Sequence, residues 1–420
     1  VNHTMPYKRL ALGRLGPGLS EESLADYGLE RDPLIDPYWE NGSPRQVKQF
    51  IAYLLYQYCG FKNLTIEPPA DVVGQGLIVF KNEQLQIVQS WNEWENRVDP
   101  DPRRSKVAVL EYATRVRRET LNIPHAIMEE IESQGLQPVL VFATEGSQAI
   151  KTFLLDEQGQ PRVDAVISLH FKFSDNEAPK VLSKLDVPII NAIQVYGRTI
   201  DEWEQSTQGL TQAEVPWQLA VPELAGLVQP NVVGGMDNAR SEISYRAIPE
   251  RVQRIVERAQ KWIELRNTPP SQRHIAILYW NYPPGKENVG ASYLNVVRSL
   301  PIMADYLRKQ GYNVGDATLE DATLTEESIV QRGRNIGRWA PGELDRLIEG
   351  GQIDRVPVSM YKEWFNDLPK SFQKKVVDCW GPPDKADIMT REIDGELQFI
   401  IPTIHLGNLV FMPQPDRART

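Results

Sequence analysis

The segment 274–312 constrains the fold more than any other part of the chain. It begins with the short apolar run Ile275–Trp280, which is typical of a strand covered on both faces. Two prolines and a glycine at 283–285 end this strand, because proline donates no ladder hydrogen bond and glycine permits a positive φ. Apolar residues between 294 and 307 then recur at helical spacing. The segment predicts a strand, a rigid loop and a helix.

The loop of this segment is the first candidate ligand site. It follows the carboxyl end of a strand, where open α/β sheets bind their ligands. Free backbone N–H groups at the start of the helix, together with the charge of Lys286, suit a carboxylate or a phosphate. The alternative is an ordinary strand-to-helix connection whose glycine only permits tight packing. The candidate substrate-binding residues here are Lys286, Asn288, Gly290 and Ser292.

Strand-like and helical segments alternate over much of the remaining chain. Strands are predicted at 106–110, 138–142, 163–171 and 187–190, and helices at 127–134, around 180–182 and at 249–266. Alternation at these lengths is typical of βαβ crossovers and a parallel sheet. The predicted fold class is therefore α/β, with tandem parallel-sheet (Rossmann-like) units.

The first hundred residues have little strand character. Ser43 and Pro44 precede apolar residues at helical spacing, which predicts the start of an amphipathic helix. A polar, proline-rich linker at 99–104 follows and marks a domain boundary. We expect four parts: an N-terminal helical region (1–102), a first α/β domain (103–245), a second α/β domain (246–345) and a helical/β connection (346–420).

Composition excludes several classes of protein. The net charge of −10 over 420 residues argues against a nucleic-acid-binding protein, which needs a basic face. Two cysteines, Cys59 and Cys379, are too few for a disulfide framework and are expected to be buried. No apolar run of about 18 residues predicts a membrane span. These features favour a cytoplasmic protein, although a chain that opens VNHTMPYKRL is consistent with an internal fragment.

Two strand-associated positions have competing interpretations. His170 lies in an apolar segment two residues before Lys172, and a hydrogen-bonded core histidine is favoured there over a ligand. Glu145 directly follows a strand. A helix start, with the acid near the positive end of the helix dipole, is favoured there over a ligand loop.

Four motifs in a fixed order carry a resemblance to a known family. They occupy Trp203–Leu210, Val221–Gly235, Pro283–Leu300 and Leu406–Arg417. The third reads PPGKENVGASYLNVVRSL, and the last reads GN followed by QP and an arginine. Together they are similar to the CobN/magnesium-chelatase large-subunit (H-type) family. The chain resembles most the cobaltochelatase type and looks like an N-terminal or middle fragment of it.

The resemblance implies the large, tetrapyrrole-binding subunit of an ATP-dependent metal chelatase, a ligase-type enzyme. It favours cobalt insertion into a corrinoid precursor in cobalamin biosynthesis. Alternatives within the family are a magnesium chelatase subunit, which acts on a porphyrin, and a haem-demetallating homologue. No ATP-binding glycine loop occurs in the sequence, so AAA+ partner subunits would supply ATP. Cobalt or magnesium would be a substrate, and no cofactor is expected on this segment. A non-catalytic two-domain small-molecule binding protein is the alternative from another class.

The last motif supplies the second candidate site. His405 and Asn408 lie in a turn between predicted strands, and Gln414 and Arg417 follow a proline. Arginine can hold a ring carboxylate through two hydrogen bonds, so we expect these four residues to mark the tetrapyrrole entrance. A plain β-hairpin with a polar tip is the alternative. The resemblance places the catalytic residues after Thr420, so this segment alone is expected to be inactive, and the sequence identifies no metal ligands.

Overall fold

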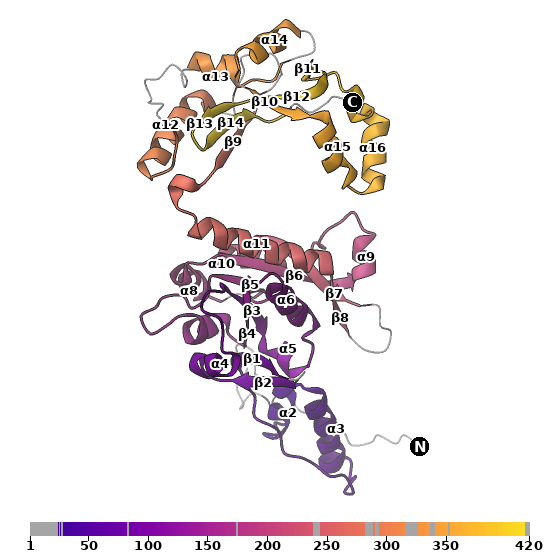
Figure 1. Ribbon diagram of the computed structural model, residues 1–420. Coiled ribbons are helices and arrows are strands. Elements are labelled where there is room, and N and C mark those ends of the chain that lie inside the picture. The colour runs from indigo at the N-terminus through magenta and orange to yellow at the C-terminus, as the bar shows by residue number, and fades with distance from the viewer. Residues whose placement is uncertain are drawn as a thin grey trace. The chain divides into compact units, whose positions relative to one another are not determined.

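The computed structural model describes residues 28–81, 84–173, 175–237, 244–281, 294–315, 326–336, 341–351 and 353–415, with Leu24, Asp26 and Val289 as single positions. The chain forms two compact units, Val1–Glu264 and Leu265–Thr420, and each is described by itself (Figure 1). The four-part division at 102, 245 and 345 is finer than this one and stays a prediction.

An eight-stranded sheet forms the centre of the first unit. Its strands lie in the order β2-β1-β4-β3-β5-β6-β7-β8. They are β1 (Gln75–Lys81), β2 (Gln84–Val88), β3 (Lys106–Tyr112), β4 (Gln137–Ala143), β5 (Ala165–Ser168), β6 (Ile189–Thr199), β7 (Val228–Met236) and β8 (Tyr245–Ala247). The five strands from β4 to β7 in this order run parallel, while β1, β2 and β8 pair antiparallel at the edges. The predicted α/β class is confirmed.

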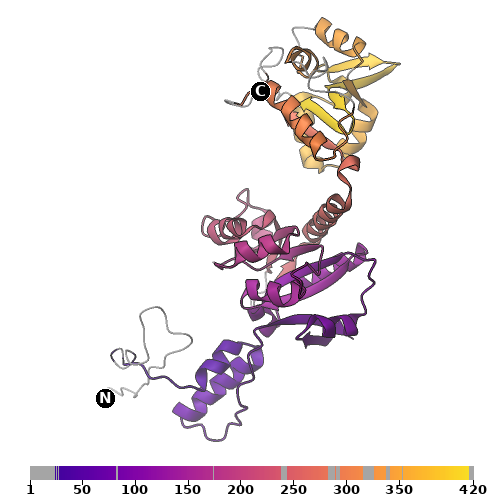
Figure 2. The ribbon, with the colours of Figure 1, turned by 90° about the vertical axis from the view of Figure 1, so that its left-hand side faces the viewer.

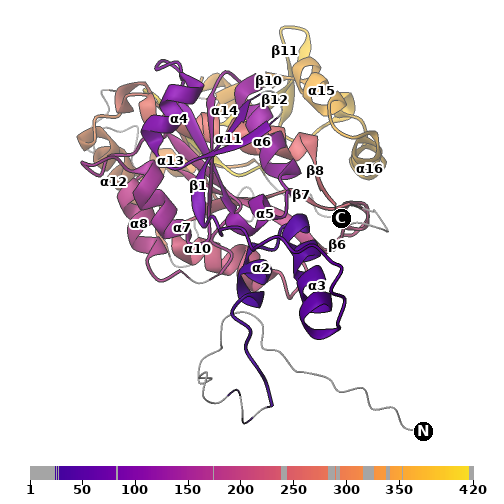
Figure 3. The same cartoon turned by 90° about the horizontal axis from the view of Figure 1, so that it is seen from below.

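Helices cover both faces of this sheet. One face packs against α5 (Ala113–Arg117), α6 (Asn122–Ser133) and α11 (Pro249–Asn267). The other packs against α4 (Trp91–Val98), α7 (Gly146–Ala149) with its π-helical continuation η2 (Ile150–Leu154), α8 (Ala178–Leu185) and α10 (Val221–Ala225). Figure 3 shows α7, α8 and α10 on one side of the strands and α5 and α6 on the other. Two apolar layers therefore hold the strands, as expected for a parallel sheet.

The hairpin β1–β2 departs from the expected helical region at 1–102. Leu77 and Val79 face one apolar layer, and Ile78 faces the other. The sequence of a strand that is buried on both faces is a short continuous apolar run. Such a run lacks the alternation of apolar and polar residues by which a strand is recognised in a sequence. The helix predicted after Ser43 is present as α3 (Pro44–Tyr58), and a further helix, α2 (Ile35–Asn41), lies beside it in Figure 2.

Strand order places a topological switch beside β3. The chain passes from β3 to β4 on one side and then crosses to β5 on the other side, so β3 is flanked by β4 and β5. In doubly wound sheets the crevice for ligands lies at the carboxyl ends of the strands beside such a switch. The carboxyl ends of β3 and β5 are therefore the first place to look for a site.

Two glycines of the second motif lie where backbones come very close. A Cβ on Gly234 would stand 2.4 Å from the backbone oxygen of Arg246 on β8. A Cβ on Gly235 would stand 2.8 Å from the backbone oxygen of Val195 on β6. Both neighbours are backbone atoms of the sheet and cannot rotate away. The glycine pair thus allows β7 to pack between β6 and β8.

Gly234→Ala is expected to lower the free energy of unfolding by about 1–3 kcal/mol, because the added methyl group overpacks the β7–β8 pair. Urea denaturation measures this directly. Gly342→Ala is the matched control, since a Cβ on Gly342 meets nothing within 4 Å. Equal stability of the Gly234 variant and the wild type would contradict this packing role.

The second unit contains two three-stranded sheets. The first sheet has the strand order β13-β14-β9 and consists of β13 (Ile404–Leu406), β14 (Leu409–Pro413) and β9 (Ile275–Tyr279). The second sheet has the strand order β10-β12-β11 and consists of β10 (Ile353–Pro357), β12 (Glu396–Pro402) and β11 (Thr390–Ile393). The helices are α12 (Val296–Lys309), α13 (Glu326–Arg332), α14 (Pro341–Glu349), α15 (Val358–Asn366) and α16 (Lys370–Trp380). The strand and helix predicted within 274–312 are present as β9 and α12.

Three details of the sequence analysis are wrong. The strand β9 is covered on one face only: Ile277 and Tyr279 pack with α12, whereas Leu278 is 57% exposed. An uninterrupted apolar run does not distinguish a strand with one covered face from one with two. Cys59 and Cys379 are exposed rather than buried, because each lies near a solvent-facing end of a helix.

Candidate functional site

Polar and charged side chains gather at the carboxyl ends of β3, β5 and β6. Glu111 lies near the end of β3, and His170 and Lys172 follow β5 directly. Asn191 and Gln194 lie on β6, the next strand in the sheet. All five are buried. The switch point found in the topology thus coincides with the main buried polar cluster of the first unit.

Burial changes the acid–base behaviour of the two charged residues in this cluster. Loss of solvent raises the pKa of Glu111 to about 7, against smaller opposing effects of the Tyr112 backbone N–H and of Arg115. The same cause lowers the pKa of Lys172 to about 7, and the nearby Glu111 opposes this shift. An acid and a base in one cluster therefore both titrate near neutral pH, which is characteristic of functional sites.

A chain of amide groups connects the acid to the base. The Lys172 ammonium donates to the Asn191 side-chain oxygen and to the Ala192 carbonyl, the latter at 2.8 Å. Asn191 Nδ2 donates to the Gln218 carbonyl at 2.8 Å. Gln218 in turn donates to the Gln194 carbonyl, and Gln194 Nε2 lies 3.5 Å from Glu111 Oε2. The cluster is one network that joins β3, the segment after β5, β6 and η3 (Pro216–Ala220).

His170 has a structural place in this cluster. Its Nδ1 accepts from the Phe171 backbone N–H at 2.7 Å, so its Nε2 carries the proton and donates to the Ala143 carbonyl at 3.3 Å. Burial lowers the pKa of His170 to about 4, which keeps the ring neutral. The predicted core histidine is confirmed. The predicted helix start at Glu145 is also confirmed, because α7 begins at Gly146 with Glu145 as its N-cap residue.

Five aromatic side chains form a row over the buried network, and we call them the aromatic row. They are Tyr112, Phe173, Trp217, Tyr196 and Tyr245. The rings of Phe173 and Trp217 are almost parallel, 6.3 Å apart at an interplanar angle of 4°. Successive ring centroids along the row lie between 5.3 and 6.3 Å apart. Phe173 is 69% exposed, so the row reaches the surface.

Arg115 places a positive charge beside this row. Its guanidinium carbon lies 3.9 Å from the ring centroid of Tyr245 and 5.3 Å from that of Tyr196. The guanidinium also donates to Gln194 Oε1 at 2.8 Å, which joins it to the buried network. Aromatic faces hold a flat conjugated ring, and an arginine binds a carboxylate attached to it. This edge of the sheet is chemically suited to a planar, anionic ligand.

The predicted residues of the second unit that the structure describes, His405, Asn408 and Gln414, fall at two different ends of one sheet. Lys286, Asn288, Gly290 and Ser292 lie outside the described residues, as does Arg417. Gln414 lies at the carboxyl ends of the parallel strands β9 and β14, where its N–H donates to the Tyr279 carbonyl at 2.8 Å. Asn335 connects Gln414 with Asn281, the last described residue before the predicted loop: its N–H donates to Asn281 Oδ1 at 2.9 Å, and its side-chain amide donates to the Gln414 carbonyl at 2.7 Å.

His405 and Asn408 lie away from that edge. The Asn408 carbonyl accepts from the Ile275 N–H at the amino end of β9, and its side chain donates to the Ser271 carbonyl at 3.1 Å. The exposed His405 ring lies 3.0 Å from an Asp354 oxygen on β10. With β14 between them, Asn408 and Gln414 are separated by about 20 Å along the strand direction. A shared tetrapyrrole entrance of these residues stays a prediction.

Sequence reasoning missed the aromatic row and Arg115. Their position in the sequence could have indicated a ligand site, because Tyr112 ends a strand and Phe173 closely follows one. Ligands bind at the carboxyl ends of strands in open α/β sheets, and Tyr112 and Phe173 lie at such ends as Glu145 does. Trp217 lies in a π-helix, which sequence periodicity does not indicate.

The described residues contain neither a cluster of metal-binding side chains nor a membrane-spanning helix. Within the described residues, no group of three or more histidine, cysteine, aspartate or glutamate side chains is placed to hold a metal ion. Across the same parts of the chain, every helix is too short or too polar to cross a membrane.

Comparison with known proteins confirms the resemblance inferred from the motifs. The family model described as CobN/Magnesium Chelatase matches residues 36–420. The chain is 37% identical over 216 residues to the chloroplastic magnesium-chelatase subunit ChlH of Oryza sativa subsp. indica, a match that covers 49% of this chain and 15% of that protein. It is 24% identical over 306 residues to the aerobic cobaltochelatase subunit CobN of Sinorhizobium sp, covering 70% of this chain and 23% of the relative.

The fold has a solved counterpart. The catalytic subunit of cobaltochelatase from Mycobacterium tuberculosis superposes with a TM-score of 0.65 at 22% identity, covering 91% of this chain and 31% of that one. This likeness concerns the fold. The chain spans at most about a third of the length of these relatives.

Proposed function

The chain belongs to the CobN/magnesium chelatase family, and on that premise we propose that it is the tetrapyrrole-contacting part of the large subunit of an ATP-dependent metal chelatase. The observation that carries the proposal is the site at the carboxyl edge of the eight-stranded sheet. There the aromatic row offers faces for a flat macrocycle, and Arg115 offers a partner for one of its carboxylates. Lys286 and Arg417 remain proposed as further carboxylate contacts.

Cobalt insertion into a corrinoid precursor of cobalamin is the proposed reaction, and magnesium insertion is the second candidate. The similarity to a magnesium-chelatase subunit at 37% identity over about half of the chain favours the second. Either metal is a substrate, and removing its bound water while distorting the ring requires energy. We propose that AAA+ partner subunits supply this energy from ATP, in the cytoplasm, and that the catalytic residues lie after Thr420.

Full-length protein, mixed with candidate ATPase subunits and ATP, tests the reaction. Cobalt and magnesium are each offered with a metal-free corrinoid precursor and with protoporphyrin, and the change in absorption spectrum reports insertion. Cobalt entering the corrinoid is the expected outcome. Magnesium entering protoporphyrin would establish the second candidate, and binding without any insertion would support a non-catalytic binding protein.

The chain alone is expected to hydrolyse no ATP, because its sequence lacks the glycine loop with lysine and serine or threonine that cradles phosphates. A phosphate-release assay on the purified chain measures this. Adding the ATPase subunits should restore hydrolysis. Turnover by the chain on its own would contradict the partner-dependent proposal.

A further inference from the structure

A cavity opens in the first unit, apart from the aromatic row. It has a volume of about 370 Å³ and lies between the end of α2, the helix α5 and the residue that follows β4. We call it the Arg117 pocket. Its lining includes Trp39, Gly42, Thr114, Arg117, Arg118 and Thr144. Two adjacent arginines and two threonines thus surround one space in a chain whose net charge is negative.

Arg117 is fixed in position but only partly satisfied. Its Nε donates to the Asn41 carbonyl at 3.0 Å, which orients the guanidinium. Its Nη1 is buried and has no hydrogen-bond partner among the described residues. The charge of Arg117 is therefore only partly paired among the described residues, and an anion in the cavity that Arg117 lines would interact favourably with it. The neighbouring Arg118 adds to the positive charge and is exposed.

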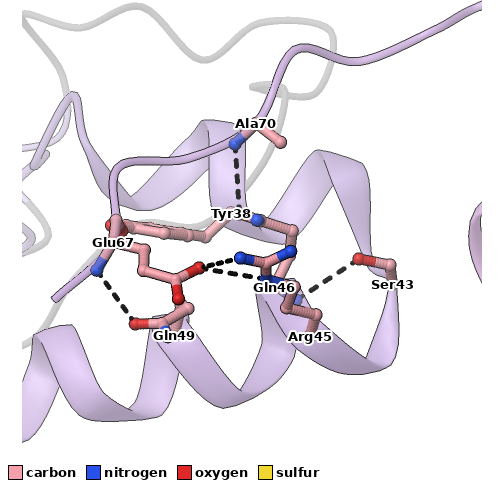
Figure 4. A network of polar contacts seen from close by, with 7 residues as sticks. All are labelled: Tyr38, Ser43, Arg45, Gln46, Gln49, Glu67 and Ala70. Carbon is pink, nitrogen blue, oxygen red and sulfur yellow. Dashed lines mark hydrogen bonds and ion pairs between the residues drawn. The ribbon is translucent and has the colours of Figure 1, made fainter.

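Hydrogen bonds and an ion pair hold the segment 67–71, which leads into the pocket residue Val72, against α2 and α3. Figure 4 shows the segment 67–70 tied to α3: Gln46 accepts from the Ala70 N–H at 3.3 Å and Gln49 from the Glu67 N–H at 3.2 Å. Arg45 forms an ion pair with Glu67 at 2.7 Å. Asn41, from the end of α2, donates to the Asp71 carbonyl at 3.4 Å. These contacts fix the backbone next to the pocket residues Asn41 and Val72.

The size of the pocket and Trp39 indicate what else the ligand carries. A water molecule occupies about 30 Å³ in the liquid, so the space is far larger than a single carboxylate requires. Trp39, whose side chain is apolar and 52% exposed, is among the residues that line it. A ligand with one anionic end and a planar apolar body matches both features.

We propose that the Arg117 pocket binds a small organic carboxylate, with its carboxylate on Arg117 and Arg118 and its apolar body against Trp39. The proposal goes beyond the chelatase reaction and does not rest on it. Such a ligand is either a free metabolite or a carboxylate side chain of a tetrapyrrole, and both present the same chemistry to the arginines. Glu40, which also lines the pocket, is the internal competitor for these charges.

Calorimetric titration of the full chain with indole-3-propionate tests this pocket. Arg117→Gln is expected to weaken binding at least tenfold and Arg118→Gln severalfold, since a charge-assisted hydrogen bond is lost in each. Glu40→Gln should strengthen binding. Because Arg118 is exposed, its variant keeps the test valid if Arg117→Gln unfolds. Arg254→Gln, an exposed arginine of α11, is the matched control.

Three results would overturn the proposal: no binding of indole-3-propionate, unchanged affinity in the Arg118 variant, or an equal loss in the Arg254 control. Two further titrations distinguish the source of the carboxylate. Displacement of indole-3-propionate by protoporphyrin supports a tetrapyrrole side chain, and binding without displacement supports a free metabolite. Failure of metal insertion by the full-length protein would leave these titrations unchanged, so the two proposals fail separately.

Discussion

Lys172→Met is expected to lower the free energy of unfolding by about 3–5 kcal/mol, because it removes one partner of a buried acid–base cluster and leaves the other behind. The variant loses the donors to Asn191 and Ala192, whose oxygens stay buried. It also removes the positive charge that favours ionised Glu111. Urea denaturation at pH 7 measures the change, and Lys180→Met on the exposed face of α8 is the control.

The double variant Lys172→Met/Glu111→Gln is expected to recover part of this loss, because no buried carboxylate then remains without its partner. A single variant as stable as the wild type would show that the cluster does not couple the acid and the base. The coupling would also be contradicted if the double variant lost more free energy of unfolding than the two single variants lose together.

The pH dependence of the free energy of unfolding is a separate test of the cluster. Glu111 has a raised pKa, so its contribution to stability is present in full below its ordinary pKa near 4.5 and is lost as the pH rises through about 7. Lys172 has a lowered pKa, so its contribution is present above 10.5 and is lost as the pH falls towards about 7. Glu111→Gln should therefore abolish the decrease in stability between pH 4.5 and 7. Persistence of that decrease would assign it to other groups.

Replacing both Phe173 and Trp217 by alanine is expected to weaken tetrapyrrole binding by about 10- to 100-fold, which corresponds to about 1.4–2.8 kcal/mol. The two rings are almost parallel and supply the exposed face of the aromatic row. Quenching of protein fluorescence by a metal-free corrinoid or porphyrin measures the affinity. Phe61→Ala removes an aromatic ring that is 53% exposed outside the row and should leave the affinity unchanged. Unaltered binding in the double alanine variant would exclude the row as the ring surface.

The sequence allowed much of the fold to be predicted, because the apolar patterns of most strands and helices are local. β3, β4 and β9 lie where their apolar runs predicted them, and α3 begins at the predicted Ser43 cap. The hairpin β1–β2 was missed because Leu77–Val79 is buried on both sides and too short to show a period. Gly234 and Gly235 carried the family resemblance, but their role of letting strands approach closely is visible only in three dimensions.

The candidate site could not be predicted for a different reason. The aromatic row draws on residues from Tyr112 to Tyr245, which meet only because β3, β5, β6, η3 and β8 come together in the fold. No spacing rule joins residues so far apart along the chain. The pKa shifts of Glu111 and Lys172 likewise arise from burial, which the sequence shows only for apolar runs.

Hydrogen–deuterium exchange of the full-length protein, with and without a metal-free tetrapyrrole, shows whether the carboxyl edge of the eight-stranded sheet binds the ring. We expect slower exchange in the segments that carry the site, at 110–118, 165–177, 190–198 and 214–220. The segments 249–267 and 358–380 serve as internal references that should not change. Protection confined to 282–293 and 404–417, with no change at the carboxyl edge of the eight-stranded sheet, would contradict a ring-binding site at that edge.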